Sequence, residues 1–300
     1  MLVIYLVIII ILSILNYYLV IKENFLDRRT NNFDLIPKIF LLESQKLGLQ
    51  NQIINFNPTK VKIFNDKKEV IITPLSYTFN NNKIRRVKIA RNKFKTYNLL
   101  RQNGIPTPNF QLFQNIIPRT RNMVINRKNI NYPVVVKIID GANGDNVYVD
   151  IQNNKELIYA IDQIINNNHK ELMIEEFIKG NDHRVLMFNN KLIDVVRRTS
   201  PFIIGDGVKN IKELVKNKND KRRNLGHRPI QIDYYYLKKC NLNLEYVPNI
   251  REKITVNPLS NFHKGADLER IDIKNIHPDN KELFKKISKV MDLNILGIDF

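Results

Sequence analysis

The stretch that most constrains the fold of this chain runs from residue 132 to residue 188. An apolar run ends at Lys137 and is followed by a turn that contains Gly141 and Gly144. An amphipathic segment with helical spacing follows over residues 153–165, and a second apolar run then ends in acidic residues. This order predicts strand, turn, strand, helix and strand. It places a cation and flexible backbone on one side of a cleft and carboxylates on the other, an arrangement that suits a nucleoside triphosphate.

The composition sets wide bounds. The chain has 300 residues with 43% hydrophobic content, enough for a sizeable core in one large or two ordinary domains. A net charge of +19 favours anionic partners, but lysine is spread along the whole chain, so the base composition of the gene explains much of it. The single cysteine, Cys240, excludes an internal disulfide and a cysteine-based zinc site.

The first 21 residues predict a membrane anchor. Residues 2–21 are almost continuously apolar, and a helix of that length spans about 30 Å. The alternatives are a cleaved signal peptide and a buried core helix. No basic segment precedes the run and no small-residue cleavage site follows it, and a helix that is apolar on all sides is rarely a core helix at the N-terminus. Because Lys22, Arg28 and Arg29 follow the span, we expect a single-pass protein whose main domain lies in the cytosol.

The remaining chain divides at about residue 88. Residues 22–87 are interpreted as a linker or as an N-terminal region that precedes the main domain. Their pattern predicts a helix over 36–49 and strands over 60–64 and 69–72. Beyond residue 88 the pattern predicts a helix that stops at Gly104 and a variable connection over 109–131. A hairpin across Asn189 and Asn190, a short helix over 211–215 and a basic loop over 216–228 follow. The chain closes with a helix over 278–291 and a strand over 295–300.

A series of sequence blocks in this order resembles the ATP-grasp superfamily, most closely the ATP-grasp domain of cyanophycin synthetase. The matching blocks are residues 91–93, 99–108, 134–137, 140–144, 174–186, 205–208, 211–214, 219–227, 261–267, 276–280 and 296–300. The resemblance implies an α+β ATP-grasp fold over residues 88–300, in which two α+β subdomains grip ATP, behind the membrane helix.

The resemblance also implies the positions of the nucleotide contacts. Lys93 and Lys137 would contact the phosphates of ATP, where two ammonium groups offset negative charge. Gly141 and Gly144 would let a mobile loop close over the phosphates with its backbone amides pointing inward.

Further residues would hold the nucleoside and take part in the reaction. The adenine would lie against residues Glu175, Glu176, Phe177 and Ile178. Asp182 would accept the ribose hydroxyl groups, and Arg184 would be a catalytic residue that faces an acyl phosphate. Asp299 would be a magnesium ligand, since Mg²⁺ prefers hard oxygen donors.

These assignments imply an ATP- and Mg²⁺-dependent ligase that joins a carboxylate to an amine through an acyl phosphate, with both substrates unidentified. The chain departs from the family pattern in three places. Asp145 and Asn146 stand where a basic residue and a further glycine are usual, which predicts weaker loop closure. Asn257 and Pro258 replace an arginine pair. No Glu-x-Asn strand follows Phe300. This departure is consistent with a truncated, split or decaying form of a ligase, and in the split form a partner chain would supply the strand.

Two other functions are consistent with the sequence. One is a catalytically inactive ATP-binding or scaffolding protein at a membrane. The other is a nucleic-acid binder that uses the basic run at 216–228, which ranks lower because aromatic residues that stack on bases are not interleaved with the cations.

Overall fold

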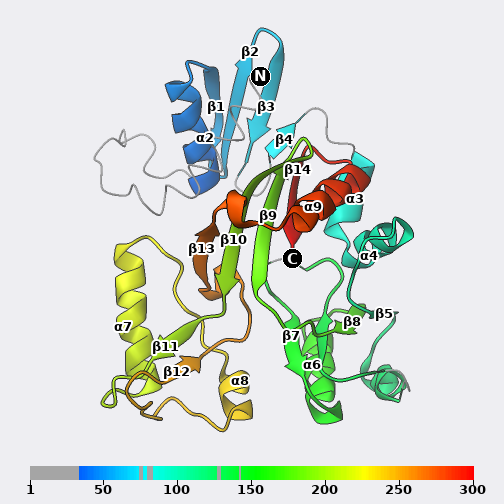
Figure 1. Cartoon of the computed structure of the whole chain (residues 1–300), viewed down its shortest axis with the longest axis vertical. Coiled ribbons are helices and arrows are strands. Elements are labelled where there is room, and N and C mark those ends of the chain that lie inside the picture. The colour runs from blue at the N-terminus through cyan, green and yellow to red at the C-terminus, as the bar shows by residue number, and fades with distance from the viewer. Residues whose placement is uncertain (1–33, 74–76, 80–83, 127–129, 142) are drawn as a thin grey trace.

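The computed structural model describes residues 34–73, 77–79, 84–126, 130–141 and 143–300. The predicted membrane anchor at residues 2–21 lies outside these ranges and stays a prediction. Within the described ranges, no helix combines the length and apolar character that a membrane span requires. The described chain folds into lobes arranged around a central antiparallel sheet (Figure 1).

The N-terminal lobe is one helix packed on a small antiparallel sheet. Its elements, in sheet order, are β1 (Gln50–Phe56), β2 (Thr59–Asn65), β3 (Lys68–Ile72) and β4 (Tyr77–Phe79), covered by α2 (Leu35–Lys46). Val61 and Ile63 alternate with less buried residues along β2, so one face of the sheet packs against Phe40 of α2. Phe188 from the central sheet completes this core and joins the lobe to the rest of the molecule. The predicted helix and strand pair are confirmed, although the helix ends at Lys46.

The central sheet has the strand order β13-β10-β9-β14. Its strands are β9 (Asp182–Phe188), β10 (Lys191–Thr199), β13 (Asp267–Ile271) and β14 (Ile295–Asp299), and three helices pack against it: α3 (Ile84–Arg91), α4 (Lys93–Gln102) and α9 (Pro278–Met291). The apolar face of α9 buries Phe284 and Met291 against Val185 of β9. The predicted final helix and strand are therefore both confirmed.

The hairpin between β9 and β10 contains a tight turn and a bulge. Asn189 and Asn190 have φ angles of 45° and 61°, the left-handed values that a type I′ turn requires, as predicted. Beyond the turn the pairing is regular until Ile193, which is an extra residue on β10 without an opposite partner on β9. From this bulge onward the register is shifted by one, so that Arg198 lies opposite Asp182.

A second α+β unit, here called the lid lobe, contains the predicted strand–turn–strand–helix–strand order. Its elements are β5 (Phe110–Phe113), the 3₁₀ helix η2 (Pro118–Thr120), α5 (Arg121–Ile125), β6 (Val134–Lys137), β7 (Val147–Ile151), α6 (Asn154–Asn166) and β8 (Leu172–Glu176), with the sheet order β5-β8-β6-β7. Leu157, Ile161 and Ile164 on one face of α6 bury against the sheet. β5 falls within the stretch that was predicted to be a variable connection, and it forms a strand because it pairs along β8.

The third lobe corrects the prediction of a basic loop. It contains β11 (Phe202–Ile204), α7 (Ile211–Asn224), α8 (Tyr234–Lys239) and β12 (Lys253–Thr255). The predicted helix over 211–215 continues to Asn224, so most of the basic run is helical. Asn210 and Glu213 form a capping box that starts the helix. Lys218 and Arg222, one turn apart, both form ion pairs with Asp267, so these two cations of the run are directed inward.

Candidate functional site

Lys93 stands at the start of α4, where the helix meets the lid lobe. The side chain of Asn92 caps the helix by accepting a hydrogen bond from the Lys95 N–H at 2.9 Å. The Lys93 Nζ donates to the backbone carbonyl of Gly141 at 2.7 Å. Burial lowers the pKa of the Lys93 ammonium group, and the positive charge of Lys137 lowers it further. The structure thus brings Lys93, Lys137 and Gly141 together.

Lys137 forms an ion pair with Glu175 inside the lid lobe. The Nζ of Lys137 lies 2.6 Å from Oε1 of Glu175, and the two side chains are only 12% and 9% exposed. They meet because β6 and β8 are neighbours: Glu175 lies opposite Val135, two residues before Lys137 on the same face. Lys137 also donates to the Tyr97 hydroxyl at 3.2 Å. Burial, followed by the nearby Glu175 carboxylate, raises the pKa of Tyr97, which keeps this hydroxyl protonated.

The second oxygen of Glu175 is buried beside the Lys137 pair. This Oε2 has no hydrogen-bond partner within the described part of the chain. A buried acceptor without a donor is costly, so this oxygen is a candidate acceptor for an N–H or O–H group. Ile178, three residues further on, is 59% exposed. Glu176 differs, since its Oε2 accepts from the Asn109 backbone N–H and side-chain amide, both at 3.3 Å.

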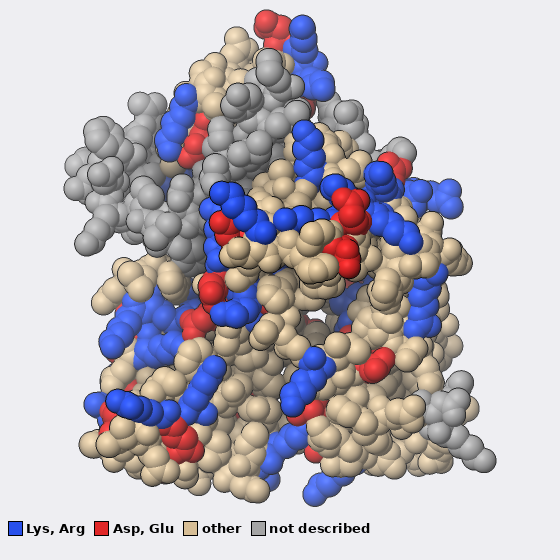
Figure 2. All heavy atoms as spheres, in the orientation of Figure 1, with Lys and Arg blue, Asp and Glu red and all other residues tan. Residues whose placement is uncertain are grey.

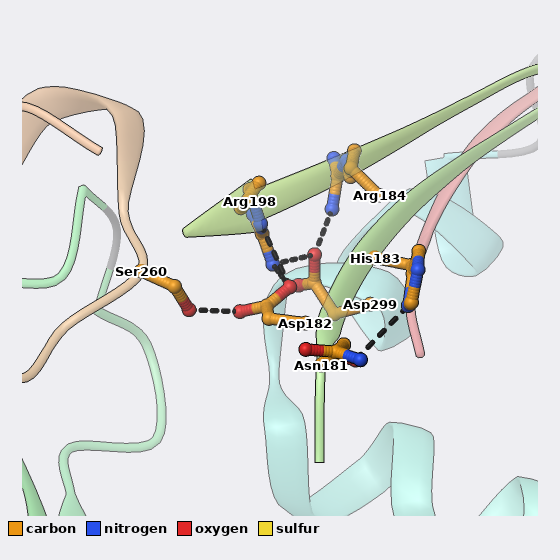
Figure 3. Close-up of polar contacts among 7 residues, drawn as sticks. All are labelled: Asn181, Asp182, His183, Arg184, Arg198, Ser260 and Asp299. Atoms are coloured by element: carbon orange, nitrogen blue, oxygen red, sulfur yellow. Dashed lines mark hydrogen bonds and ion pairs between the residues drawn. The ribbon is translucent and has the colours of Figure 1, made fainter. Parts of the chain in front are cut away.

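Asp182 and Asp299 are joined by an arginine that sequence reasoning missed. Figure 3 shows Arg198 between the two carboxylates, with Nε donating to Oδ1 of Asp182 at 2.8 Å and NH2 donating to Oδ1 of Asp299 at 2.9 Å. Arg184 donates to the same Asp299 oxygen at 2.8 Å, and Ser260 donates to Oδ2 of Asp182. The predicted ribose acceptor, catalytic arginine and metal ligand therefore form one network. Arg198 follows Arg197 in the sequence, and no local signal distinguishes the two.

Gly297 makes room for Arg184. A Cβ atom added to Gly297 would lie 2.2 Å from NH2 of Arg184, so the guanidinium group crosses directly over this glycine. Gly297 is paired with Leu186 in the sheet, and Asp299, two residues later, is paired with Arg184. A glycine at position 297 thus lets Arg184 lie flat against β14 and reach the carboxylate of Asp299.

The carboxylate of Asp299, the predicted magnesium ligand, is paired with two arginines. Loss of solvent around Asp299 acts to raise its pKa, but the guanidinium groups of Arg184 and Arg198 outweigh this effect and lower the pKa. The carboxylate is thus ionised, but it is already neutralised by two cations. In the ranges that the structure describes, no group of three acidic, histidine or cysteine side chains is placed to hold a metal ion. The magnesium role of Asp299 stays a prediction.

The turn after Lys137, described over residues 143–146, contacts the segment that contains Asn261 and Lys264. Gly144 has a φ of 76°, and a Cβ atom on it would lie 3.3 Å from the side chain of Asn261. Asp145 forms an ion pair with Lys264 at 2.8 Å. The turn thus lies against the opposite segment although it lacks the basic residue that is usual in the family. The space-filling view shows a cleft, where the surface is hollowed between the lid lobe and the third lobe in the lower half of the picture (Figure 2).

Comparison with known proteins identifies the family to which part of the chain is similar. Residues 90–206 match the RimK-like ATP-grasp domain. The cyanophycin synthetase of Crocosphaera subtropica is 30% identical over 226 residues, which are 71% of this chain and 25% of that protein. The glutathione biosynthesis bifunctional protein of Clostridium perfringens is 26% identical over 299 residues, 92% of this chain and 37% of that protein. The chain therefore spans about a quarter to a third of the length of these relatives.

A solved structure shows the same fold. The bifunctional glutathione synthetase from Pasteurella multocida superposes with a TM-score of 0.56 at 21% identity, covering 89% of this chain and 36% of that one. The matched domain, residues 90–206, includes Lys93, Lys137, Glu175 and Asp182. By this sequence match and this fold, the chain belongs to the ATP-grasp superfamily and carries an ATP-grasp domain of the RimK-like type.

Proposed function

We propose that this protein binds ATP in the cleft between the lid lobe and the central sheet. The observation that carries the proposal is the buried Lys137–Glu175 pair, whose carboxylate keeps one oxygen without a donor. The exocyclic amino group of adenine is an N–H donor of the kind that oxygen lacks. The ammonium groups of Lys93 and Lys137 would lie toward the phosphates, and Asp182 toward the ribose.

The reaction that this site supports best is the joining of a carboxylate to an amine. A carboxylate oxygen of the first substrate would attack the γ-phosphorus of ATP, which forms an acyl phosphate and releases ADP. The amine would then attack the acyl carbon and expel inorganic phosphate, leaving an amide. Lys93, Lys137 and Arg184 would offset the negative charge that moves during the phosphoryl transfer.

One observation favours a second candidate, an ATP-binding protein that does not turn ATP over. Both carboxylates at the far end of the site are engaged by arginine: Asp182 by Arg198, and Asp299 by Arg184 and Arg198. In this arrangement the predicted metal ligand is already neutralised, which would allow nucleotide binding without catalysis. The two candidates share the ATP site and differ in whether ADP and phosphate are released.

The test is ATP binding to the full-length chain by calorimetry, with and without Mg²⁺. We expect Lys137→Ala and Asp182→Ala each to weaken ATP affinity by about ten-fold or more, the value of one charge-assisted hydrogen bond of about 1.5–3 kcal/mol. Lys285→Ala is the matched control, since this lysine lies on the exposed face of α9 and pairs with the exposed Glu282. Unchanged affinity in both site variants would refute the assigned site. ADP release with candidate carboxylates and amines separates the ligase from the binding protein.

A further inference from the structure

Lys264 reaches across the cleft to the tip of the lid lobe. Its Nζ lies 2.8 Å from Oδ1 of Asp145, a residue 119 positions earlier in the chain. The Lys264 side chain is 20% exposed, whereas that of Asp145 is 61% exposed. A long, flexible side chain that is mostly covered by protein and ends on an exposed carboxylate is directed toward the turn and not into solvent.

The lysine is held in place on its own side of the cleft. It ends the 3₁₀ helix η3 (Phe262–Lys264), which Asn261 caps by accepting from the His263 N–H at 2.8 Å. The backbone carbonyl of Lys264 accepts from Gln231 at 3.1 Å. The next residue, Gly265, has a φ of 89°, and a Cβ atom there would lie 2.5 Å from the backbone of Ile230. These contacts fix the position from which the lysine extends.

The turn is held by its other end to the lid lobe. The side-chain oxygen of Asn146 accepts a hydrogen bond from Asn167 at 2.6 Å, and its amide nitrogen lies 3.1 Å from Nε2 of His169. Both partners follow the end of α6. Asp145, the residue before Asn146, therefore projects from an anchored position, so the ion pair with Lys264 bridges two structures that are each fixed locally.

The bridge lies next to the lysine pair of the nucleotide site. A Cβ atom on Gly141 would lie 3.3 Å from the backbone oxygen of Asp145, and the Gly141 carbonyl accepts from Lys93. Lys93, Gly141, Asp145 and Lys264 thus form a continuous series of contacts from the start of α4 to η3. A displacement of the turn would be transmitted to the backbone group that Lys93 contacts.

We propose that Lys264 is a positioning residue for the nucleotide phosphates, which holds the 143–146 turn across the cleft through Asp145. The role at the phosphates rests on the proposed ATP site, whereas the ion pair itself does not.

The first experiment measures the bridge without nucleotide. Amide hydrogen exchange of the segment around residues 143–146 is followed in the full-length protein and in Asp145→Asn, Lys264→Gln and the double variant. We expect about two- to five-fold faster exchange in each single variant, the value of a partly exposed ion pair, and no further increase in the double variant. The double reversal Asp145→Lys with Lys264→Asp should restore slow exchange. If the two substitutions speed exchange additively, or do not change it, Asp145 and Lys264 do not hold the turn through their ion pair.

The second experiment measures the role in binding. Lys264→Gln should weaken ATP affinity about two- to five-fold and leave adenosine affinity unchanged, because the turn lies on the phosphate side; a merely structural role would change both or neither. Asp220→Asn, which removes an exposed ion pair with Arg223 on α7, is the control. If the wild-type protein binds no ATP, the proposed function and the role of Lys264 at the phosphates are both wrong. The exchange data would still show whether Asp145 and Lys264 hold the turn. If Lys137→Ala weakens ATP binding and Lys264→Gln does not, the site stands and this inference is wrong.

Discussion

Replacing Lys137 by methionine should destabilise the fold far more than the loss of one surface contact would. The substitution removes the cation that lies 2.6 Å from Glu175, whose side chain is 9% exposed. Methionine fills most of the space of the lysine stem, so the main effect is a buried carboxylate without its counter-charge. Breaking a buried pair by removing one partner costs about 3–5 kcal/mol. We therefore expect the free energy of unfolding to fall by about that amount.

Denaturant unfolding followed by circular dichroism measures this loss. The double variant Lys137→Met with Glu175→Leu should recover most of the stability, because replacing both buried charges by apolar groups is often close to neutral. Lys285→Met, which breaks the exposed pair with Glu282, should cost about 1 kcal/mol or less. The reasoning is wrong if Lys137→Met costs no more than this control, or if the double variant is no more stable than the single one.

Two further predictions concern stability. Gly205→Ala should lower the free energy of unfolding by about 1–3 kcal/mol in denaturant titrations, because the new Cβ atom would lie 2.1 Å from the Asn249 carbonyl oxygen. Gly180→Ala is the control and should be neutral, since nothing lies within 4 Å of a Cβ atom there. Equal losses of stability in the two variants would refute the steric argument. Burial and then the charge of Arg228 lower the pKa of His263, so the folded state binds fewer protons there than the unfolded chain, and stability should fall as pH drops below about 6.5. His263→Gln should make that fall shallower between about pH 6.5 and pH 5.5 in urea midpoints, and an unchanged slope would contradict the assignment.

Local patterns predicted the elements whose signals lie within a short stretch. The elements of the lid lobe from β6 to β8 were predicted from two apolar runs, the glycine-containing turn between them and the amphipathic face of α6. The turn at Asn189 and Asn190 followed from two residues that tolerate positive φ. α7 was predicted too short because a run of cations is typical of a solvated loop. Two of those cations instead contact Asp267, which comes more than forty residues later.

The residues of the candidate site could be predicted only where they match the sequence pattern of the family. The family pattern points to Lys93 and Lys137, which lie close together, but the spacing of the sequence says nothing about the contact between Asp182 and Asp299 through Arg198. That contact depends on which strands become neighbours in the central sheet, and β14 pairs with β9 across more than a hundred intervening residues. Long-range pairing of this kind is a property of the whole fold and leaves no local trace.

The bulge at Ile193 decides which of two adjacent arginines serves the site. If β10 continued to pair with β9 without the extra residue, Arg197 would lie opposite Asp182, and Arg198 would lie beyond the end of the ladder. The shift by one instead places Arg198 there and leaves Arg197 to pair with Glu269. Deleting the single residue 193 would preserve every pairing between the strands, whereas straightening the strand at constant length would exchange the two arginines. An apolar residue within β10 thus determines which of the two arginines joins the network of Asp182 and Asp299.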